Sequence, residues 1–145
     1  MEQVMIEPTT KKLSSEIFDN IKMSEVIYAE AAFPGAMGSA GSVMLYIIEN
    51  NKFICYISNI YENEDLFLRA EAIIRDQAYY SKYFDYEFFH YDGSMGNDVY
   101  INKNISLYIG KGYFIYHKGN EMYRIYTSSM GVFDYFVFTY CEEKQ

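Results

Sequence analysis

The sequence has few basic residues. Its 145 residues include 12 Lys and Arg against 20 Asp and Glu, and the formal net charge is -8. Nucleic acids and anionic lipids bind proteins largely by releasing counterions to cationic surfaces, so this charge argues against both as ligands. A basic protein partner fits the charge better.

Thiol and imidazole groups are also scarce. Cys55 and Cys141 have no metal-binding or redox spacing, and we expect both to be reduced, with Cys55 packed as a small hydrophobic residue in a strand. His90 and His117 belong to no HxH or HExxH motif. The sequence therefore predicts no metal site and no cofactor, and we expect neither histidine to be an essential acid or base.

Long apolar runs are missing. No run approaches the roughly 20 residues that cross a bilayer, so we expect no membrane association. Met1–Pro8 has neither the positive start nor the apolar centre of a secretory signal. We therefore expect a cytoplasmic protein.

Nucleophile motifs are absent as well. Ser94 and Ser129 lack the G-x-S-x-G context of an exposed nucleophile. The glycine-rich segment 34–42 contains no Lys and precedes a strand pattern, which excludes a phosphate-binding P-loop and indicates a plain connection. No catalytic residue is predicted.

Apolar and aromatic side chains, in contrast, are abundant. Half of the residues are hydrophobic, and the chain has 17 Tyr and 11 Phe. This supply supports a sizeable core, and the length fits one domain. We predict a single compact α+β domain over residues 1–145.

The centre of the expected sheet is the apolar run Val43–Ile48. Both faces of this run are apolar, as in an interior strand that is covered on both sides. Asn50 and Asn51 tolerate the positive φ of a two-residue hairpin turn, which would connect this strand to Lys52–Ser58. A further strand is expected over Val26–Phe33.

Two helices are predicted. Leu13, Ile17 and Ile21 recur every four residues after a Thr hydroxyl that would cap a short N-terminal helix. A longer central helix is expected to begin after Asn63, with acidic residues in its first turn. Its inward side would carry Leu66, Phe67, Ala70, Ile73, Ile74 and Gln77.

The remaining strands are expected to form a C-terminal antiparallel meander. Short turns separate its segments, which favours antiparallel pairing. An aromatic strand over Tyr83–Tyr91 precedes it. One face of the meander would be packed and the other phenolic and half-hydrated. The segments are 98–102, 105–110, 113–118, 121–128 and 133–140.

The most informative departure from a bland composition is the charge between Asn59 and Asp98. This stretch holds nine acidic and three basic residues, a net charge of -6. Tyrosines that suit interface anchors follow the acidic helix. The predicted partner-binding residues are Glu62, Glu64, Asp65, Glu71, Asp76, Tyr83, Asp85, Tyr86 and Glu87.

These features favour a non-enzymatic binding protein that recognises a basic protein partner. In their general character they resemble the immunity proteins, small acidic inhibitors of bacterial toxins, although no motif assigns the chain to a particular family. Two alternatives stay open: a small-molecule-binding domain with a pocket lined by Tyr and Met, and a small hydrolase using His90 and Asp92. The Met of three Met-Gly pairs, at 37–38, 95–96 and 130–131, would line such a pocket if their loops converge.

Overall fold

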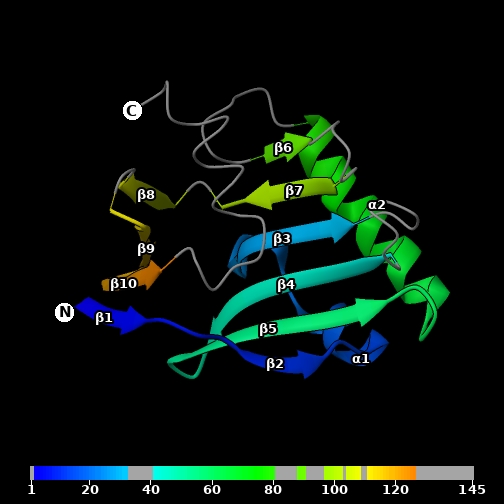
Figure 1. Ribbon diagram of the computed structural model, residues 1–145, viewed down its shortest axis with the longest axis horizontal. Coiled ribbons are helices and arrows are strands. Elements are labelled where there is room, and N and C mark those ends of the chain that lie inside the picture. The colour runs from blue at the N-terminus through cyan, green and yellow to red at the C-terminus, as the bar shows by residue number, and fades with distance from the viewer. Residues whose placement is uncertain are drawn as a thin grey trace. The chain divides into compact units, whose positions relative to one another are not determined.

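The computed structural model has an α+β fold with two β-sheets (Figure 1). It describes residues 2–32, 41–80, 88–90, 97–102, 104–108 and 111–126. Two compact units emerge, one of Thr9–Asn102 and one of Met1–Pro8 with Lys103–Gln145, and each is considered by itself. The single domain expected from the chain length stays a prediction. No helix in the described part of the chain is long and apolar enough to cross a membrane.

The larger unit contains a six-stranded sheet. Its strand order is β2-β5-β4-β3-β7-β6, and all of its pairs are antiparallel except β2 with β5. β4 therefore lies in the interior of the sheet, between β5 and β3. The strands are β2 (Thr9–Lys12), β3 (Val26–Ala32), β4 (Ser42–Glu49), β5 (Lys52–Asn59), β6 (Phe88–His90) and β7 (Asn97–Ile101).

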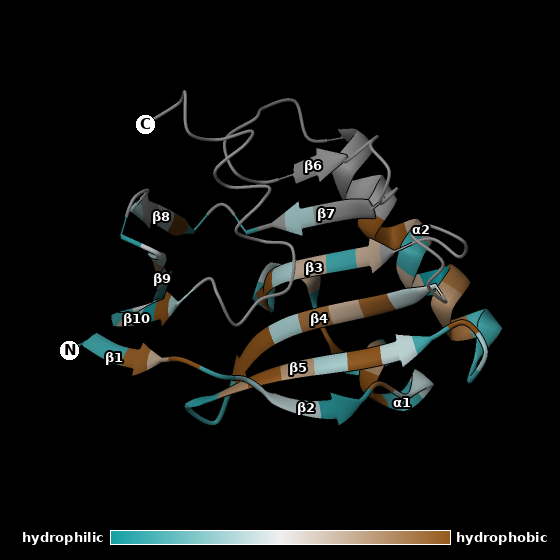
Figure 2. Cartoon of the chain, viewed as in Figure 1, coloured by the Kyte–Doolittle hydropathy of each residue, from teal (hydrophilic) through white to brown (hydrophobic). Residues whose placement is uncertain are grey.

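The β4–β5 hairpin confirms the predicted turn. Asn50 and Asn51 have φ angles of 53° and 61°, so both central residues adopt the left-handed conformation of a type I′ turn. The turn places Glu49 opposite Lys52 and fixes the register of the two strands. In both strands hydrophobic residues, drawn brown, are interrupted by paler and hydrophilic ones (Figure 2).

The prediction of an interior strand over Val43–Ile48 is also confirmed. Val43 and Leu45 are fully buried on one face of β4, while Tyr46 and Ile48 are buried on the other, at 4% and 5% exposure. Both faces of β4 are therefore covered, as the apolar run predicted.

The N-terminal helix is shorter than expected. α1 spans Ser15–Asn20, and its cap is Ser14, whose Oγ accepts a hydrogen bond from Ile17 N at 3.2 Å. The expected Thr cap is wrong because Thr9 and Thr10 belong to β2, where they pair with β5. A 3-10 turn, η1 (Met23–Glu25), then leads into β3.

The central helix α2 spans Glu64–Tyr80, and Asn63 caps it as predicted. The Asn63 side-chain oxygen accepts a hydrogen bond from Leu66 N at 3.0 Å. The side of α2 that packs on the sheet matches the predicted stripe as far as the side chains are described. Leu66, Phe67, Ala70 and Ile74 are buried and Ile73 is partly buried; the Gln77 side chain lies outside the described residues.

The sheet face opposite this core is buried as well. Tyr28, Tyr46 and Cys55 occupy cross-strand positions on it and are each at most 4% exposed. The Tyr28 and Tyr46 rings meet edge to face at 5.5 Å, and the Tyr28 hydroxyl donates to Glu30 at 2.7 Å. The expected packing of Cys55 as a buried residue is confirmed.

The smaller unit contains a four-stranded sheet in the order β1-β10-β9-β8. β8, β9 and β10 form an antiparallel meander, while β1 pairs in parallel with β10. The sequence did not suggest β1 as a strand. The strands are β1 (Glu2–Met5), β8 (Ile105–Tyr108), β9 (Tyr113–Lys118) and β10 (Glu121–Tyr126).

The predicted meander is thus wrong at its start, because β7 pairs with β3 in the other sheet. Asn102 anchors this segment: its backbone N–H donates to Ile27 O at 3.0 Å, and its side-chain amide donates to Ser24 O and Val26 O. The predicted strand 133–140 lies outside the described residues, as do 83–87 and most of the segment 34–42.

The tyrosines of this meander divide between its faces. Tyr116 and Tyr123 are adjacent on the buried face, at 3% and 2% exposure. Tyr108, Tyr113 and Tyr126 form a cross-strand row on the other face, where Tyr108 is 43% exposed. The predicted phenolic, half-hydrated face is therefore present, whereas Tyr116 and Tyr123 belong to the packed face.

Candidate functional site

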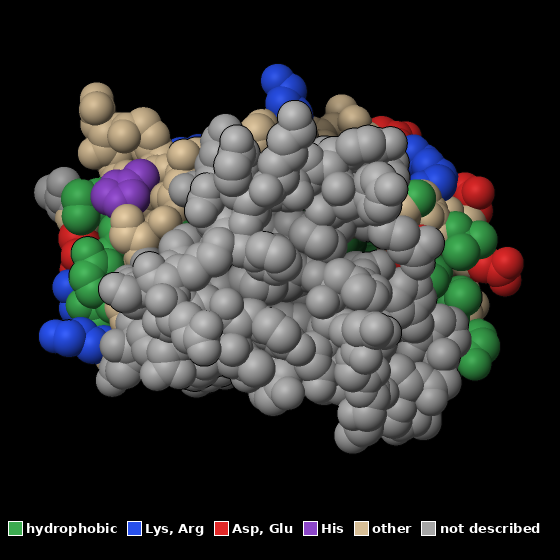
Figure 3. Space-filling view, turned by 90° about the horizontal axis from the view of Figure 1, so that it is seen from above, with side chains coloured by type: hydrophobic (Ala, Val, Ile, Leu, Met, Phe, Trp, Pro, Cys, Tyr) green, Lys and Arg blue, Asp and Glu red, His purple; other side chains and the backbone are tan. Residues whose placement is uncertain are grey.

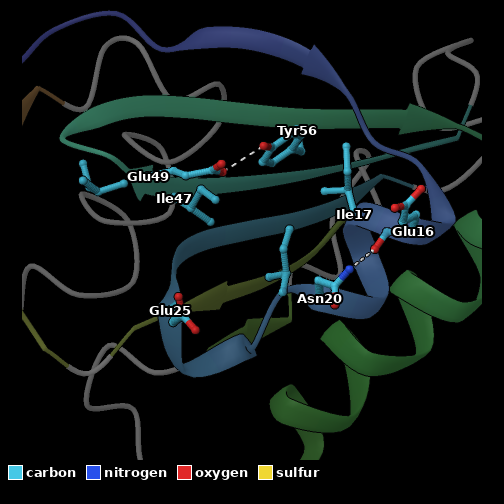
Figure 4. Close-up of a pocket in the computed structure, with 9 residues that line it drawn as sticks. Glu16, Ile17, Asn20, Glu25, Ile47, Glu49 and Tyr56 are labelled. Atoms are coloured by element: carbon cyan, nitrogen blue, oxygen red, sulfur yellow. Dashed lines mark hydrogen bonds between the residues drawn. The ribbon is translucent and has the colours of Figure 1, made fainter.

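A pocket of about 330 Å³ opens beside α1 in the larger unit (Figure 4). Its walls come from α1, η1, the end of β4 and the middle of β5, so residues as far apart in the chain as Glu16 and Tyr56 meet there. The lining residues are Glu16, Ile17, Asn20, Ile21, Glu25, Ile47, Ile48, Glu49 and Tyr56.

The charge of this pocket has one sign. Glu16, Glu25 and Glu49 are exposed and line it, and among the residues that the structure describes no Lys or Arg does. Lys22 and Lys52, the basic residues nearest in sequence to Glu25 and Glu49, are not part of the lining. The pocket therefore favours a cationic occupant.

One carboxylate is held in place by a buried phenol. The Tyr56 hydroxyl donates to Glu49 Oε2 at 2.9 Å, and Tyr56 is 5% exposed. Burial raises the pKa of Tyr56, and the hydrogen bond and negative charge of Glu49 raise it further. The phenol thus stays protonated at neutral pH and fixes the direction of the Glu49 side chain.

The rest of the lining is largely aliphatic. Ile17 and Ile21 from the α1 region are half-buried, and Ile47 and Ile48 from β4 are buried. Asn20 closes the last turn of α1, where its side-chain amide donates to Glu16 O at 2.9 Å. Carboxylates around an apolar lining suit the side chain of Lys or Arg, whose methylene stem packs on apolar surface while its charged end stays near acids.

The carboxylates do not form a metal site. Among the residues that the structure describes, no group of three His, Cys, Asp or Glu side chains is placed to hold a metal ion. The glutamates of the pocket come from separate elements and surround the opening (Figure 4). This arrangement suits an extended cation better than a metal ion.

A second pocket, of about 300 Å³, differs in charge. Lys11 and Lys12 line it together with Glu62, and Lys12 lies 3.6 Å from the Glu62 carboxylate. Opposite charges there neutralise one another, so this pocket has no strong preference for an ion of either sign. The pocket beside α1 is the stronger candidate.

Three predicted partner-binding residues lie at the beginning of α2. Glu64 and Asp65 are exposed in its first turn, as expected. Glu62 is exposed in the preceding turn, but it also accepts a hydrogen bond from Asn59 at 3.0 Å and pairs with Lys12. Part of its charge is therefore already engaged within the chain.

Glu71 differs from its expected position. It is 6% exposed on α2, whereas a partner-facing role required an exposed carboxylate. The buried side of α2 is wider than its apolar stripe and includes position 71. The side chain of Asp76 and the residues Tyr83, Asp85, Tyr86 and Glu87 lie outside the described residues, so their role stays a prediction.

The structure tests neither the hydrolase site of His90 and Asp92 nor the convergence of the three Met-Gly loops. The His90 side chain and Asp92 lie outside the described part, as do the three Met-Gly pairs. His117 is exposed on β9. The described lining of the pocket beside α1 contains one tyrosine and no methionine, so these residues do not form the Tyr- and Met-lined pocket that the sequence suggested.

The glutamates of the pocket were missed by the sequence reasoning. Glu16 belongs to a helix only six residues long, Glu25 to a 3-10 turn and Glu49 to a strand end. The three glutamates share no local sequence pattern, because they belong to three separate elements that meet only in the folded protein. The position of Glu49 just before the predicted hairpin turn was the only available signal.

Comparison with known proteins found no matching family model, no matching curated protein and no matching solved structure. A function has to be argued from the residues of this chain.

Proposed function

We propose that the chain is a non-enzymatic binding protein that recognises a basic protein partner. The observation that carries this proposal is the pocket beside α1, where Glu16, Glu25 and Glu49 surround aliphatic side chains and no described basic residue contributes. The net charge of -8 supports the same kind of partner, because it steers cationic proteins toward the chain.

The carboxylates of the pocket are available to such a partner. Among the described side chains, no Lys or Arg forms an ion pair with Glu16 or Glu25. Glu49 accepts one hydrogen bond from Tyr56, which orients it without neutralising its charge. An arriving Lys or Arg would therefore find carboxylate acceptors and an apolar lining for its stem.

The lining favours binding over catalysis. It offers carboxylates, one amide and one phenol, and the phenol already donates to Glu49. The described lining contains no thiol, imidazole or aliphatic hydroxyl, so these residues supply no activated nucleophile.

The test begins with capture of the partner from source cells and measurement of its association with the purified protein. Glu16→Gln with Glu25→Gln removes two charges from the pocket and leaves the Tyr56–Glu49 bond intact. We expect association to slow at least about tenfold at low salt and to depend less on salt, because steering by charge is lost.

A matched control removes two charges elsewhere. Glu7→Gln with Glu121→Gln changes exposed acids of the smaller unit by the same amount, and a glutamine at 121 still offers Tyr123 an acceptor. This variant should associate nearly as fast as the original protein. If association slows equally in both variants, the effect comes from net charge and not from the pocket. If association does not slow in the pocket variant, the proposal is refuted.

A further inference from the structure

The outward side of α2 carries an exposed apolar row. Leu68 is 50% exposed in the second turn of the helix, and Ala72, one turn further on, is exposed as well. Residues four positions apart are neighbours on a helix surface, so Leu68 and Ala72 lie next to one another. Ala72 is small, which would let a second helix approach α2 closely at this point.

Acids flank one end of this row. Glu64 and Asp65, four and three positions before Leu68, share its side of the helix and are exposed. Glu71, on the far side of Leu68, is buried and does not contribute. The negative charge is therefore concentrated at the N-terminal end of the row.

The nearest basic residue in the sequence, Arg69, interacts more strongly with Asp19 than with these acids. Arg69 donates to Asp19 at 2.5 Å, and its guanidinium lies over the Phe18 ring at 5.5 Å from the centroid. Its charge is thus directed mainly toward α1, and its electrostatic interaction with Asp65 is the weaker one. Acidic and hydrophobic side chains lie side by side along the right of the view in Figure 3, the side on which α2 begins in Figure 1.

This surface is also firmly supported. Leu66, Phe67 and Ala70 on the opposite side of the same turns are at most 2% exposed and pack in the core with the sheet. Asn63 holds the first turn through its cap. A partner would therefore meet a preformed helix and would lose little binding energy in ordering it.

We propose that this side of α2 is a docking surface for a basic amphipathic helix of the partner. Glu64, Leu68 and Ala72 form one i±4 ridge, with an acid at one end and apolar side chains along the rest. A helix with an apolar stripe beside Lys or Arg matches this ridge in both shape and charge. The inference rests on the proposed function, since it names the form that the basic partner takes.

The direct probe is a synthetic peptide of about 18 residues with a stripe of Leu, flanking Lys and a single Trp. The protein has no Trp, so Trp fluorescence reports only the peptide. A second peptide of the same composition, with its order scrambled to disperse the stripe, separates helix shape from charge. We expect the amphipathic peptide to bind more tightly, and its binding to weaken as salt rises.

Leu68→Ala is the decisive variant. Alanine keeps the helix and removes the main apolar contact, so the affinity for the amphipathic peptide should fall at least about fivefold. Ile6→Ala is the matched control, because Ile6 is 59% exposed in the smaller unit and its truncation should leave the affinity unchanged.

Two further variants test the charge and the close approach separately. Glu64→Gln with Asp65→Asn removes the acids beside Leu68 and should weaken binding mainly at low salt. Ala72→Lys leaves both acids in place but puts a long cation where the peptide helix would approach. It should weaken binding at low and high salt alike, because it obstructs the contact as well as repelling the peptide.

Three results would overturn the docking surface. The first is an equal affinity of the original protein and Leu68→Ala for the amphipathic peptide. The second is an equal affinity of the original protein for the amphipathic and the scrambled peptide. The third is a loss of peptide binding in the variant Glu16→Gln with Glu25→Gln while Leu68→Ala binds normally. The last result would place the peptide in the pocket beside α1. The proposed function is judged separately, by the association of the captured partner with the pocket variants.

Discussion

Shortening Leu45 to Ala tests the position of β4 inside the six-stranded sheet. Leu45 is 0% exposed and belongs to the core formed by the sheet, α1 and α2. The substitution removes buried carbon atoms and leaves a cavity, which costs about 2 to 5 kcal/mol at core positions. β4 is held between β3 and β5, so the surroundings have little room to collapse, and we expect about 3 to 5 kcal/mol.

Leu68→Ala provides a matched comparison, because it is the same chemical change at a half-exposed site. Its cost should stay within about 0.5 kcal/mol, as is usual for surface substitutions. The difference between the two variants then reports burial and not the change of residue type.

The assay is urea denaturation followed by far-UV circular dichroism and by tyrosine absorbance. Two probes are needed because the chain has two compact units, and coincident curves would establish a single transition. The midpoint should fall for Leu45→Ala while the slope with denaturant stays constant. A loss below about 1 kcal/mol would refute the reasoning and place Leu45 near the surface.

Two further predictions follow from local contacts. Asn63→Ala should lower the free energy of unfolding by about 1 kcal/mol, because Leu66 N loses its acceptor. Asn63→Asp should retain most of the stability. Equal stabilities of Asn63→Ala and the original protein would show that the cap does not stabilise α2. Burial raises the pKa of the Cys55 thiol to about 11 from its ordinary 9.0, and the charge of Glu30 adds to this, while a hydrogen bond with Tyr46 works in the opposite direction. In a Cys141→Ser background the native thiol should therefore react with iodoacetamide at pH 8 at least about 100-fold more slowly than the denatured thiol. The stability linked to the Cys55 proton is fully present below about pH 9 and is lost as the pH rises from about 9 toward 11. The melting temperature should therefore fall more between about pH 8 and about pH 10.5 for the original protein than for Cys55→Ala.

The parts of the fold that the sequence predicted correctly depend on short-range signals. The turn at Asn50 and Asn51 needs only two residues that tolerate positive φ, and Asn63 marks the beginning of α2 through a bond three residues away. The apolar run of β4 reports burial on both faces without any knowledge of what covers it. Such signals are complete within a few residues, so they can be read directly.

The errors concern partners that are distant in the chain. Thr9 and Thr10 look like helix caps locally, yet they pair with β5. In the sequence β7 resembles the first strand of a meander, but in the structure it pairs with β3, and Asn102 binds the backbone at the start of β3. Strand pairing depends on the surface presented by the finished sheet, and neither the short β1 nor the polar β2 has an alternation of hydrophobic and polar residues that would predict it.

The candidate site shows the same limit. Counting charges along the sequence selected the acids around α2, and it counted Glu71 among them although the folded helix buries that residue. The acidic pocket instead combines Glu16, Glu25 and Glu49, each unremarkable in its own segment. A cluster of this kind exists only once α1 and η1 lie beside the end of β4.

The pairing of β1 with β10 has a consequence for folding during translation. Glu2 and Arg124, which form an ion pair with a nitrogen–oxygen distance of 3.0 Å, lie 122 positions apart in the chain. During translation, residues 2–5 leave the ribosome well before residues 121–126, which form their neighbouring strand. β1 therefore cannot pair until β10 has been synthesised, whereas the β4–β5 hairpin can form as soon as it emerges. A nascent chain arrested after residue 102 should already protect the amides of β4 from hydrogen exchange while those of β1 still exchange freely.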